Sequence, residues 1–355
     1  MAREPEPLTP TEPMISPPAG DTPLLSVRDL SVTFKTDDGL VRAVDSVTFD
    51  VGANETVGIV GESGSGKSVS SLAILGLLPK SAQITGDIQF RGQSLFSLTE
   101  PEMDTIRGNE IAMIFQDALA ALNPVYTVGK QIAEAIRVHD HALDKQAIRE
   151  RSIELLDLVG IPNPTERVDQ YPHVYSGGMR QRAMIAMAIA NDPALLIADE
   201  PTTALDVTIQ AQVLEVLERI QDRTKSSIML ITHDLGVVAG VVERVIVMYA
   251  GRQVELGSVD DTFYEPKHPY TEGLLASLPR LDRRSDKTSR LHRIVGQPPS
   301  LIHVPSGCAF HPRCPYAEAP GRCSSDRPEL ADLGGGHRSA CFFPDRVGSL
   351  VEDPS

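Results

Sequence analysis

The chain lacks any hydrophobic run that approaches the roughly 20 apolar residues of a membrane-spanning helix. Its most apolar stretch, residues 235–242, is short, and Arg244 follows soon after it. The first residues also lack the apolar segment that a signal peptide requires. We therefore expect a cytoplasmic protein whose link to any membrane would come through its partners.

Positive charge is also scarce in this sequence. Its 33 Lys and Arg residues are outnumbered by 48 Asp and Glu residues, which gives a formal net charge of −15. Nucleic-acid-binding surfaces need Lys and Arg to replace the counterions of the phosphates, so this balance argues against a nucleic-acid partner. A length of 355 residues suits one large domain with additions, or two domains.

Large apolar side chains are few in residues 1–23, which contain seven prolines. Such a segment cannot bury enough surface to offset the entropy lost on ordering, so we expect a disordered tail with no assigned role. From residue 24 onward the pattern is that of a folded α/β chain. Strands are predicted at 24–34, 41–51, 55–60, 111–115, 194–198 and 227–231, and helices at 68–78, 146–159, 179–190 and 207–223.

A phosphate-binding loop stands between one predicted strand and one predicted helix. Residues 61–68 read Gly-Glu-Ser-Gly-Ser-Gly-Lys-Ser, which is the full GxxxxGK[ST] pattern. The glycines let backbone N–H groups curl around phosphates, and the helix N-terminus favours anions. Lys67 would reach the β- and γ-phosphates of ATP, and the Ser68 hydroxyl would coordinate Mg²⁺. The predicted nucleotide-binding residues are Gly61, Ser63, Gly64, Ser65, Gly66, Lys67 and Ser68.

Three further predicted strands end in polar side chains that suit nucleotide chemistry. Asp199 and Glu200 follow residues 194–198, at the strand end where ligands bind in open α/β sheets. Asp199 would hold Mg²⁺, and Glu200 would be the general base that polarises the attacking water. His233 would bond the γ-phosphate, and Gln116 would sense Mg²⁺ or the water. Taken singly, these residues also fit a solvated strand end, a structural histidine and an ordinary loop residue.

The order of these motifs matches one protein family. From residues 61–68 through Gln116, Tyr175-Ser176-Gly177-Gly178-Met179-Arg180, Asp199-Glu200 and Ala204-Leu205-Asp206 to His233, the sequence resembles the ATPase subunits of ABC transporters. The resemblance covers about residues 24–265. It implies an α/β fold with a RecA-like P-loop core, an antiparallel β subdomain and an α-helical subdomain at about residues 117–175. In the family this helical subdomain receives short cytoplasmic helices of the membrane subunits.

The resemblance also implies that the nucleotide site is shared between two chains. In the family, two ATPase domains pack head to tail, so Ser176, Gly177 and Gly178 would touch the γ-phosphate of ATP held by a partner chain. Asp206 would lie at that dimer interface. Because no internal repeat is visible, the second ATPase domain is expected from another, homologous chain. Phe34 would stack on the adenine, although a plain core position fits it almost as well.

Two departures from the family pattern lie near these motifs. Tyr175 and Met179 replace the commoner Leu and Gln, as they do in the peptide-importer branch, and Ala118 stands where that branch usually has Pro. Neither change removes a catalytic group, so we expect a half-site that is competent in hydrolysis.

Beyond residue 265 the composition changes, and residues 266–355 form a predicted C-terminal extension. Residues 268–275, 296–300 and 307–315 resemble the extension of oligopeptide and dipeptide importer ATPases. This resemblance implies a subunit that powers peptide import at the cytoplasmic face of the membrane. Its partners would be a second ATPase subunit, two permease subunits and, indirectly, an extracytoplasmic solute-binding protein. The alternatives are a nickel or other small-solute importer, and a soluble ABC ATPase that acts on DNA or ribosomes.

All four cysteines lie in this extension, within 34 residues of one another. Cys308, Cys314, Cys323 and Cys341 are separated by 5, 8 and 17 residues, and the absence of CxxC argues against a zinc ribbon. Clustered thiols in a cytoplasmic protein favour metal binding over disulfides, with free structural thiols as the other interpretation. Four thiolates suit either Zn²⁺ or a [4Fe–4S] cluster. The resemblance to peptide importers favours the [4Fe–4S] cluster, with Zn²⁺ as the alternative.

Overall fold

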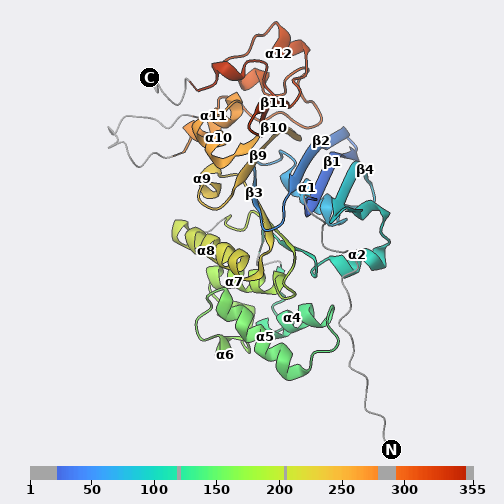
Figure 1. Ribbon diagram of the computed structural model, residues 1–355, viewed down its shortest axis with the longest axis vertical. Helices are drawn as coiled ribbons and strands as arrows, with labels where there is room; N and C mark the ends of the chain where they lie inside the picture. The colour runs from blue at the N-terminus through green and yellow to red at the C-terminus, as the bar shows by residue number, and fades with distance from the viewer. Residues whose placement is uncertain (1–21, 118–120, 204–205, 279–292, 349–355) are drawn as a thin grey trace, which may run out of the picture.

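The structure of the protein, a computed structural model, describes residues 22–117, 121–203, 206–278 and 293–348 (Figure 1). Residues 1–21 of the predicted Pro-rich tail, together with Ala118, Ala204 and Leu205, lie outside the described residues. Within that described part, no helix has both the length and the apolar character that crossing a bilayer requires.

The larger sheet contains the strands that end at the predicted nucleotide site. Its strand order is β11-β12-β10-β9-β3-β8-β7-β6, in which β6, β7, β8, β3 and β9 run parallel and the last three strands of the chain are antiparallel. The strands are β3 (Thr56–Val60), β6 (Ile111–Ile114), β7 (Leu195–Asp199), β8 (Ser227–Thr232), β9 (Arg244–Tyr249), β10 (Arg252–Ser258), β11 (Ala331–Gly334) and β12 (His337–Ser339). The strands predicted at 55–60, 111–115, 194–198 and 227–231 are thereby confirmed.

The continuous apolar runs of these strands follow from burial on both faces of the sheet. Along β7, Leu195 and Ile197 point into one hydrophobic core, whereas Leu196 and Ala198 point into another. Successive side chains of a strand alternate between faces, and helices cover both faces of a parallel sheet. These strands therefore lack the alternation of polar and apolar residues that a strand with one exposed face has.

The smaller sheet is antiparallel and lies beside the phosphate loop. Its strand order is β2-β1-β4-β5. Its strands are β1 (Leu25–Thr36), β2 (Gly39–Val51), β4 (Ala82–Phe90) and β5 (Gln93–Ser94). Helix α1 (Lys67–Ile74) packs its buried Ala73 and Ile74 into the core that the two sheets share. The predicted strands at 24–34 and 41–51 are confirmed, but the helix predicted for 68–78 stops early, because Gly76 adopts a left-handed conformation at φ 62°.

The helical region forms the lower end of the molecule in Figure 1. It consists of α4 (Val128–Arg137), α5 (Lys145–Leu158), α6 (Pro164–Arg167) and α7 (Gly177–Ala188), and α8 (Val207–Thr224) packs against α7. On α5 the buried side chains Ile148, Leu155 and Leu156 share one face, and Gly160 at φ 73° follows the helix end. The helices predicted at 146–159, 179–190 and 207–223 are confirmed.

The remaining elements are short. The helices are α2 (Glu100–Ile106), α9 (Leu235–Val238), α10 (Val259–Tyr264), α11 (Pro269–Ala276) and α12 (Arg322–Ser325). Single 3-10 turns occupy Leu95–Ser97, Pro172–Val174, His311–Arg313 and Pro344–Arg346. We call residues 293–348 the C-terminal segment. Its strand β12 pairs with β10 and so continues the larger sheet.

Candidate nucleotide-binding site

The phosphate loop connects β3 to α1, as the strand–loop–helix pattern predicts. A Cβ atom on Gly61 would lie 2.2 Å from the Met248 carbonyl oxygen, and one on Gly66 would lie 2.4 Å from the Ala43 carbonyl oxygen. Because the atoms in the way belong to the backbone of neighbouring strands, they cannot shift easily, and both positions require glycine. Gly64, at φ 78°, faces open space on the other side of the loop. The loop is therefore clamped from behind by β2 and β9, and its front is left open.

Lys67 is held at the mouth of this loop. Its ammonium nitrogen Nζ donates hydrogen bonds to the carbonyl oxygens of Gly61 at 2.7 Å and Glu62 at 3.0 Å. Burial lowers the pKa of Lys67, while the nearby carboxylates of Glu200, Asp199 and Glu62 act in the opposite direction. The Ser65 hydroxyl is also buried and, among the described residues, has no hydrogen-bond partner. Lys67 thus lines the cavity in front of the loop, whereas the Ser65 hydroxyl is buried.

The predicted catalytic side chains converge on Glu200. Its Oε2 atom accepts hydrogen bonds from Gln116 Nε2 at 3.1 Å and from Thr203 Oγ1 at 2.7 Å, and His233 Nδ1 lies 3.3 Å from the same oxygen. Glu200 adopts a left-handed conformation at φ 48° immediately after β7. Such strain persists only where the surroundings fix it, and it is common at functional sites. Thr203 is a contact that the sequence interpretation missed.

Asp199, the last residue of β7, faces the first turn of α1. The Ser68 hydroxyl donates a hydrogen bond to its Oδ1 atom at 3.0 Å. Burial raises the pKa of Asp199, and the hydrogen bond from Ser68 opposes that effect. The structure therefore brings together Lys67, Ser68, Gln116, Asp199, Glu200 and His233, which come from separate segments of the chain.

Of these residues, all but Asp199 line a cavity of about 530 Å³. It is lined by Ala43, Glu62, Ser63, Gly64, Gly66, Lys67, Ser68, Val69, Gln116, Glu200, His233 and Leu301. Phe34 does not line this cavity; it is half-buried on β1 against the core of the antiparallel sheet. Leu301 does line it, although it belongs to the C-terminal segment. Nothing in the local sequence around Leu301 indicates this contact.

The Ser176-Gly177-Gly178 motif lies at the start of α7, outside that cavity. The Ser176 hydroxyl caps the helix by accepting a hydrogen bond from the backbone N–H of Met179 at 3.2 Å. Ser176 and Gly177 are exposed, and a Cβ on Gly177 would meet no atom within 4 Å. Asp206, which caps α8, is exposed as well. The N-terminus of α7 is therefore exposed at the surface of the chain.

The four cysteines converge, but they do not form the predicted metal site. All four are free, and they line one cavity of about 20 Å³ with Phe310 and His268. Across the part of the chain that the structure describes, no group of three or more His, Cys, Asp or Glu side chains is arranged to hold a metal ion. The prediction of a [4Fe–4S] cluster is therefore wrong, and so is its Zn²⁺ alternative.

The physical reason is that these thiols belong to a hydrophobic core. Cys308 and Cys314 pack against the main core beside Phe310. Burial raises the pKa of Cys314 to about 12 and that of Cys341 to about 11, so these free thiols stay protonated at neutral pH. The cavity between them has the size of a single water molecule. Among the interpretations left open by the spacing, free structural thiols fit this arrangement.

Comparison with known proteins places the chain in a family. The sequence profile described as "ABC transporter" matches residues 44–203, and the profile described as "Oligopeptide/dipeptide transporter, C-terminal region" matches residues 254–323. A putative peptide import ATP-binding protein of Brucella abortus (strain 2308) is 51% identical over 320 residues, which make up 90% of this chain and 94% of that protein. The chain belongs to the ABC transporter family. The predicted resemblance is thereby confirmed.

Other relatives of this ABC chain have related names. The oligopeptide transport ATP-binding protein OppD of Bacillus subtilis (strain 168) is 54% identical over 298 residues, covering 83% of this chain and 82% of that protein. The protein of the same name from Mycobacterium tuberculosis (strain ATCC 25618 / H37Rv) is 52% identical over 326 residues, or 92% of this chain. Only 53% of that mycobacterial protein is covered, so the chain spans about half its length.

Solved structures confirm the ABC fold. A dimeric post-hydrolysis structure of the ATP-binding cassette MJ0796, bound to ADP and phosphate, matches with a TM-score of 0.60 and 25% identity over 66% of this chain and 98% of that one. The cbiO1 protein of Clostridium perfringens, part of the cbiONQ transporter complex, matches with a TM-score of 0.58 and 26% identity over 68% of this chain and 91% of that one. The predicted α/β P-loop fold is therefore correct.

Proposed function

We propose that this ABC chain is the ATP-hydrolysing subunit of a peptide importer. The observation that carries the proposal is the position of Glu200, whose carboxylate is oriented by Gln116, Thr203 and His233 beside the phosphate loop. A carboxylate held in this way accepts a proton from the water that attacks the γ-phosphate. His233 contacts the γ-phosphate, and Lys67 compensates the charge that develops as the bond between the γ-phosphorus and the bridging oxygen of the leaving ADP breaks.

Mg²⁺ fits the donor set on the other side of the cavity. The Ser68 hydroxyl and the Asp199 carboxylate lie 3.0 Å apart, and the Gln116 amide lines the same cavity. Mg²⁺ is usually bound by one or two carboxylates, waters and substrate phosphates rather than by an all-protein cage, so these few oxygen donors suffice. The ion would neutralise charge on the β- and γ-phosphates. Ser68, Gln116 and Asp199 would hold the ion, and with it the nucleotide, beside Glu200.

The site is proposed to be completed by a second ATPase chain. The cavity contains the phosphate loop, whereas Ser176, Gly177 and Gly178 lie outside it and expose a capped helix N-terminus. A head-to-tail pair would bring that helix N-terminus to the γ-phosphate bound by the other chain, with Asp206 at the interface. The similar MJ0796 cassette forms a dimer in its post-hydrolysis structure, which supports this arrangement. The second chain is proposed to be a homologous but different subunit.

Two permease subunits are the proposed membrane partners, which would place the chain at the cytoplasmic face of the membrane. A groove of about 840 Å³ on the helical region is lined by Tyr126, which precedes α4, and by residues of α4 and α5, among them Lys130 and Arg149. It is suited to receive a short helix from a permease. Peptides, delivered by a solute-binding protein, are the proposed cargo because the relatives at 51–54% identity are named for peptide or oligopeptide transport. These names favour peptides over nickel.

Co-expression with the neighbouring permease subunits tests this function. We expect the chain to co-purify with them and to support ATP-dependent uptake of labelled peptides into vesicles. A Lys130→Glu and Arg149→Glu double variant should lose the permeases while still binding ATP, and a Glu218→Gln variant on the exposed face of α8 serves as the control. Co-purification of nucleic acid without permeases would contradict the proposal.

A further inference from the structure

The C-terminal segment reaches the phosphate loop through one ion pair. Arg313 donates two hydrogen bonds to the carboxylate of Glu62, from Nη1 to Oε2 at 2.7 Å and from Nη2 to Oε1 at 3.0 Å. Glu62 is the second residue of the phosphate loop. The Arg313 side chain is only 5% exposed, and that of Glu62 is 28% exposed. A buried, two-point contact between guanidinium and carboxylate fixes both partners in position and in orientation.

Arg313 itself is held by several contacts. It ends the 3-10 turn His311–Arg313, its Nη1 atom lies 3.3 Å from the Tyr249 hydroxyl, and its Nε atom donates to the Val295 carbonyl at 3.2 Å. Its guanidinium carbon lies 5.8 Å and 5.9 Å from the ring centres of Tyr249 and Phe310. These contacts leave Arg313 little freedom, so it transmits the position of the C-terminal segment to Glu62.

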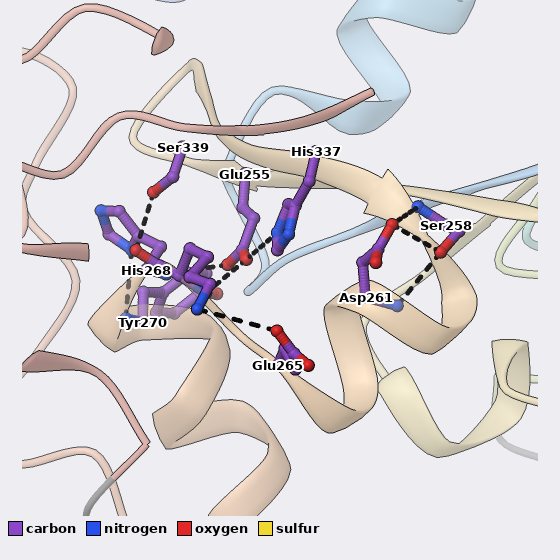
Figure 2. A network of polar contacts seen from close by, with 9 residues as sticks. Glu255, Ser258, Asp261, Glu265, His268, Tyr270, His337 and Ser339 are labelled. Carbon is purple, nitrogen blue, oxygen red and sulfur yellow. Dashed lines mark hydrogen bonds and ion pairs between the residues drawn. The ribbon is translucent and has the colours of Figure 1, made fainter. Parts of the chain in front are cut away.

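A second contact holds the backbone of Glu62. Its N–H donates a hydrogen bond to the Tyr270 hydroxyl at 2.8 Å, and Tyr270 on α11 is fully buried. Figure 2 shows Glu255 between His268 and His337, and its carboxylate accepts hydrogen bonds from the backbone N–H groups of Lys267 and His268 at the start of α11. The same carboxylate contacts His337 of the C-terminal segment at 2.7 Å. Glu62 is thus held at its backbone and at its side chain by residues outside the nucleotide-binding core.

Glu62 lies where a change in its position or charge would affect ATP. Its carbonyl oxygen accepts a hydrogen bond from Lys67 at 3.0 Å, and Glu62 lines the same cavity as Lys67 and Leu301 of the C-terminal segment. An uncompensated carboxylate at this place would repel the phosphates of ATP, and Arg313 neutralises that charge. A loop that is already in its binding conformation also loses less freedom when the ligand binds.

We propose that Arg313 is a positioning residue for the phosphate loop, which holds Glu62 in place and neutralises its charge, so that the C-terminal segment contributes to the ATP affinity of this chain. The inference rests on the proposed ATP site. Arg313 acts through Glu62 and does not line the cavity itself. The inference predicts that loss of the Arg313 side chain weakens ATP binding, and that loss of the Glu62 charge in the same chain restores ATP binding.

The test is a fluorescent ATP-binding titration of the full chain, together with steady-state hydrolysis in the assembled complex. For Arg313→Ala we expect the Kd for ATP and the KM to rise about tenfold, within the range of coupling between separate sites, and kcat to change little. Glu62→Gln combined with Arg313→Ala should recover most of the affinity. Arg346→Ala is the matched control, because Arg346 pairs with Glu318 at 3.0 Å in the same segment, and both side chains are about half exposed.

The possible outcomes are distinct. An Arg313→Ala protein that melts as a folded chain and binds ATP as tightly as the Arg346→Ala protein would overturn the inference. If Arg313→Ala does not fold, Arg313→Gln removes the charge but keeps hydrogen-bond donors, and an unchanged Kd for a folded Arg313→Gln protein overturns the inference equally. Failure of the wild-type chain to bind ATP would instead contradict the proposed function. Recovery of affinity by Glu62→Gln supports the inference, because a purely structural role for Arg313 would not produce it.

Discussion

The carboxylate of Glu200 accepts a hydrogen bond from Gln116 at 3.1 Å, although the two residues are 84 positions apart in the sequence. Parallel strands β6 and β7 lie side by side in the sheet, so the residues that follow them emerge at the same edge. This relationship between two strand ends places the proposed base within reach of the phosphate loop. Substitutions at the site and in its buried surroundings should therefore have separable effects on turnover and on stability.

Gly177 tests whether the site is shared between chains. An added Cβ at Gly177 would meet no atom within 4 Å, so Gly177→Arg should change the free energy of unfolding by no more than about 0.5 kcal/mol. ATP binding by the isolated chain should be unchanged. Hydrolysis in the assembled complex should fall about 100-fold or more, because the γ-phosphate of the partner's ATP loses its contact with the N-terminus of α7.

Gly240→Arg is the matched control for that experiment. Gly240 is exposed, and a Cβ there would also meet nothing within 4 Å. We expect full hydrolysis from this variant. Equal activity of the Gly177→Arg and Gly240→Arg complexes would argue that the helix N-terminus does not contact nucleotide.

Glu255 is the buried centre of the contacts that attach the C-terminal segment (Figure 2). Its side chain is fully buried and accepts hydrogen bonds from two backbone N–H groups, at 2.6 and 3.0 Å. In Glu255→Gln the amide NH₂ would face one of these donors, so we expect a loss of about 2 kcal/mol in the free energy of unfolding. Urea unfolding measures it, and Glu218→Gln on the exposed face of α8 should be neutral.

Burial of His268 should make the stability of the folded chain depend on pH. Burial lowers the pKa of His268 from 6.5 to about 3, so the folded chain keeps this imidazole neutral. The unfolded chain takes up a proton below pH 6.5, and the stabilisation present above that pH is lost as the pH falls. Each unit between these two pKa values should cost about 1.4 kcal/mol from this group.

His268→Asn isolates that contribution to stability. The His268 Nδ1 atom caps α11 by accepting a hydrogen bond from the Tyr270 N–H, and an Asn side chain retains an oxygen for this role while removing the titration. Urea unfolding at pH 7.5, 6 and 5 should show a shallower loss of stability for the variant than for the wild type. Parallel pH profiles would mean that His268 already carries a proton in the folded chain.

The phosphate loop and the acidic strand end could be predicted because their chemistry is local. At Gly61 and Gly66 an added Cβ would lie 2.2 and 2.4 Å from a backbone carbonyl oxygen, so both positions require glycine. Because the two glycines lie close together in the chain, the pattern can be recognised from the sequence. Asp199 and Glu200 follow a run of apolar residues that only a strand buried on both faces would need. The end of α1 was less predictable, because the apolar residues after Ile74 continue past the left-handed Gly76.

The contacts of the C-terminal segment could not be predicted in the same way. Arg313 and Glu62 are 251 residues apart, and the sequence around each of them does not indicate that the two are in contact. The Arg313 side chain is only 5% exposed because it is buried against the phosphate loop. The spacing of the cysteines likewise does not indicate whether they are buried. In the structure the thiols pack around Phe310 as part of a core.

The most direct test of the central claim is ATP turnover by the Glu200→Gln variant in the assembled complex with Mg²⁺. Gln is nearly isosteric with Glu and cannot take the proton of the attacking water, so we expect ATP binding to be retained and hydrolysis to fall by about 100-fold or more. Glu218→Gln should hydrolyse ATP normally. Hydrolysis at the wild-type rate by Glu200→Gln would contradict the assignment of Glu200 as the base.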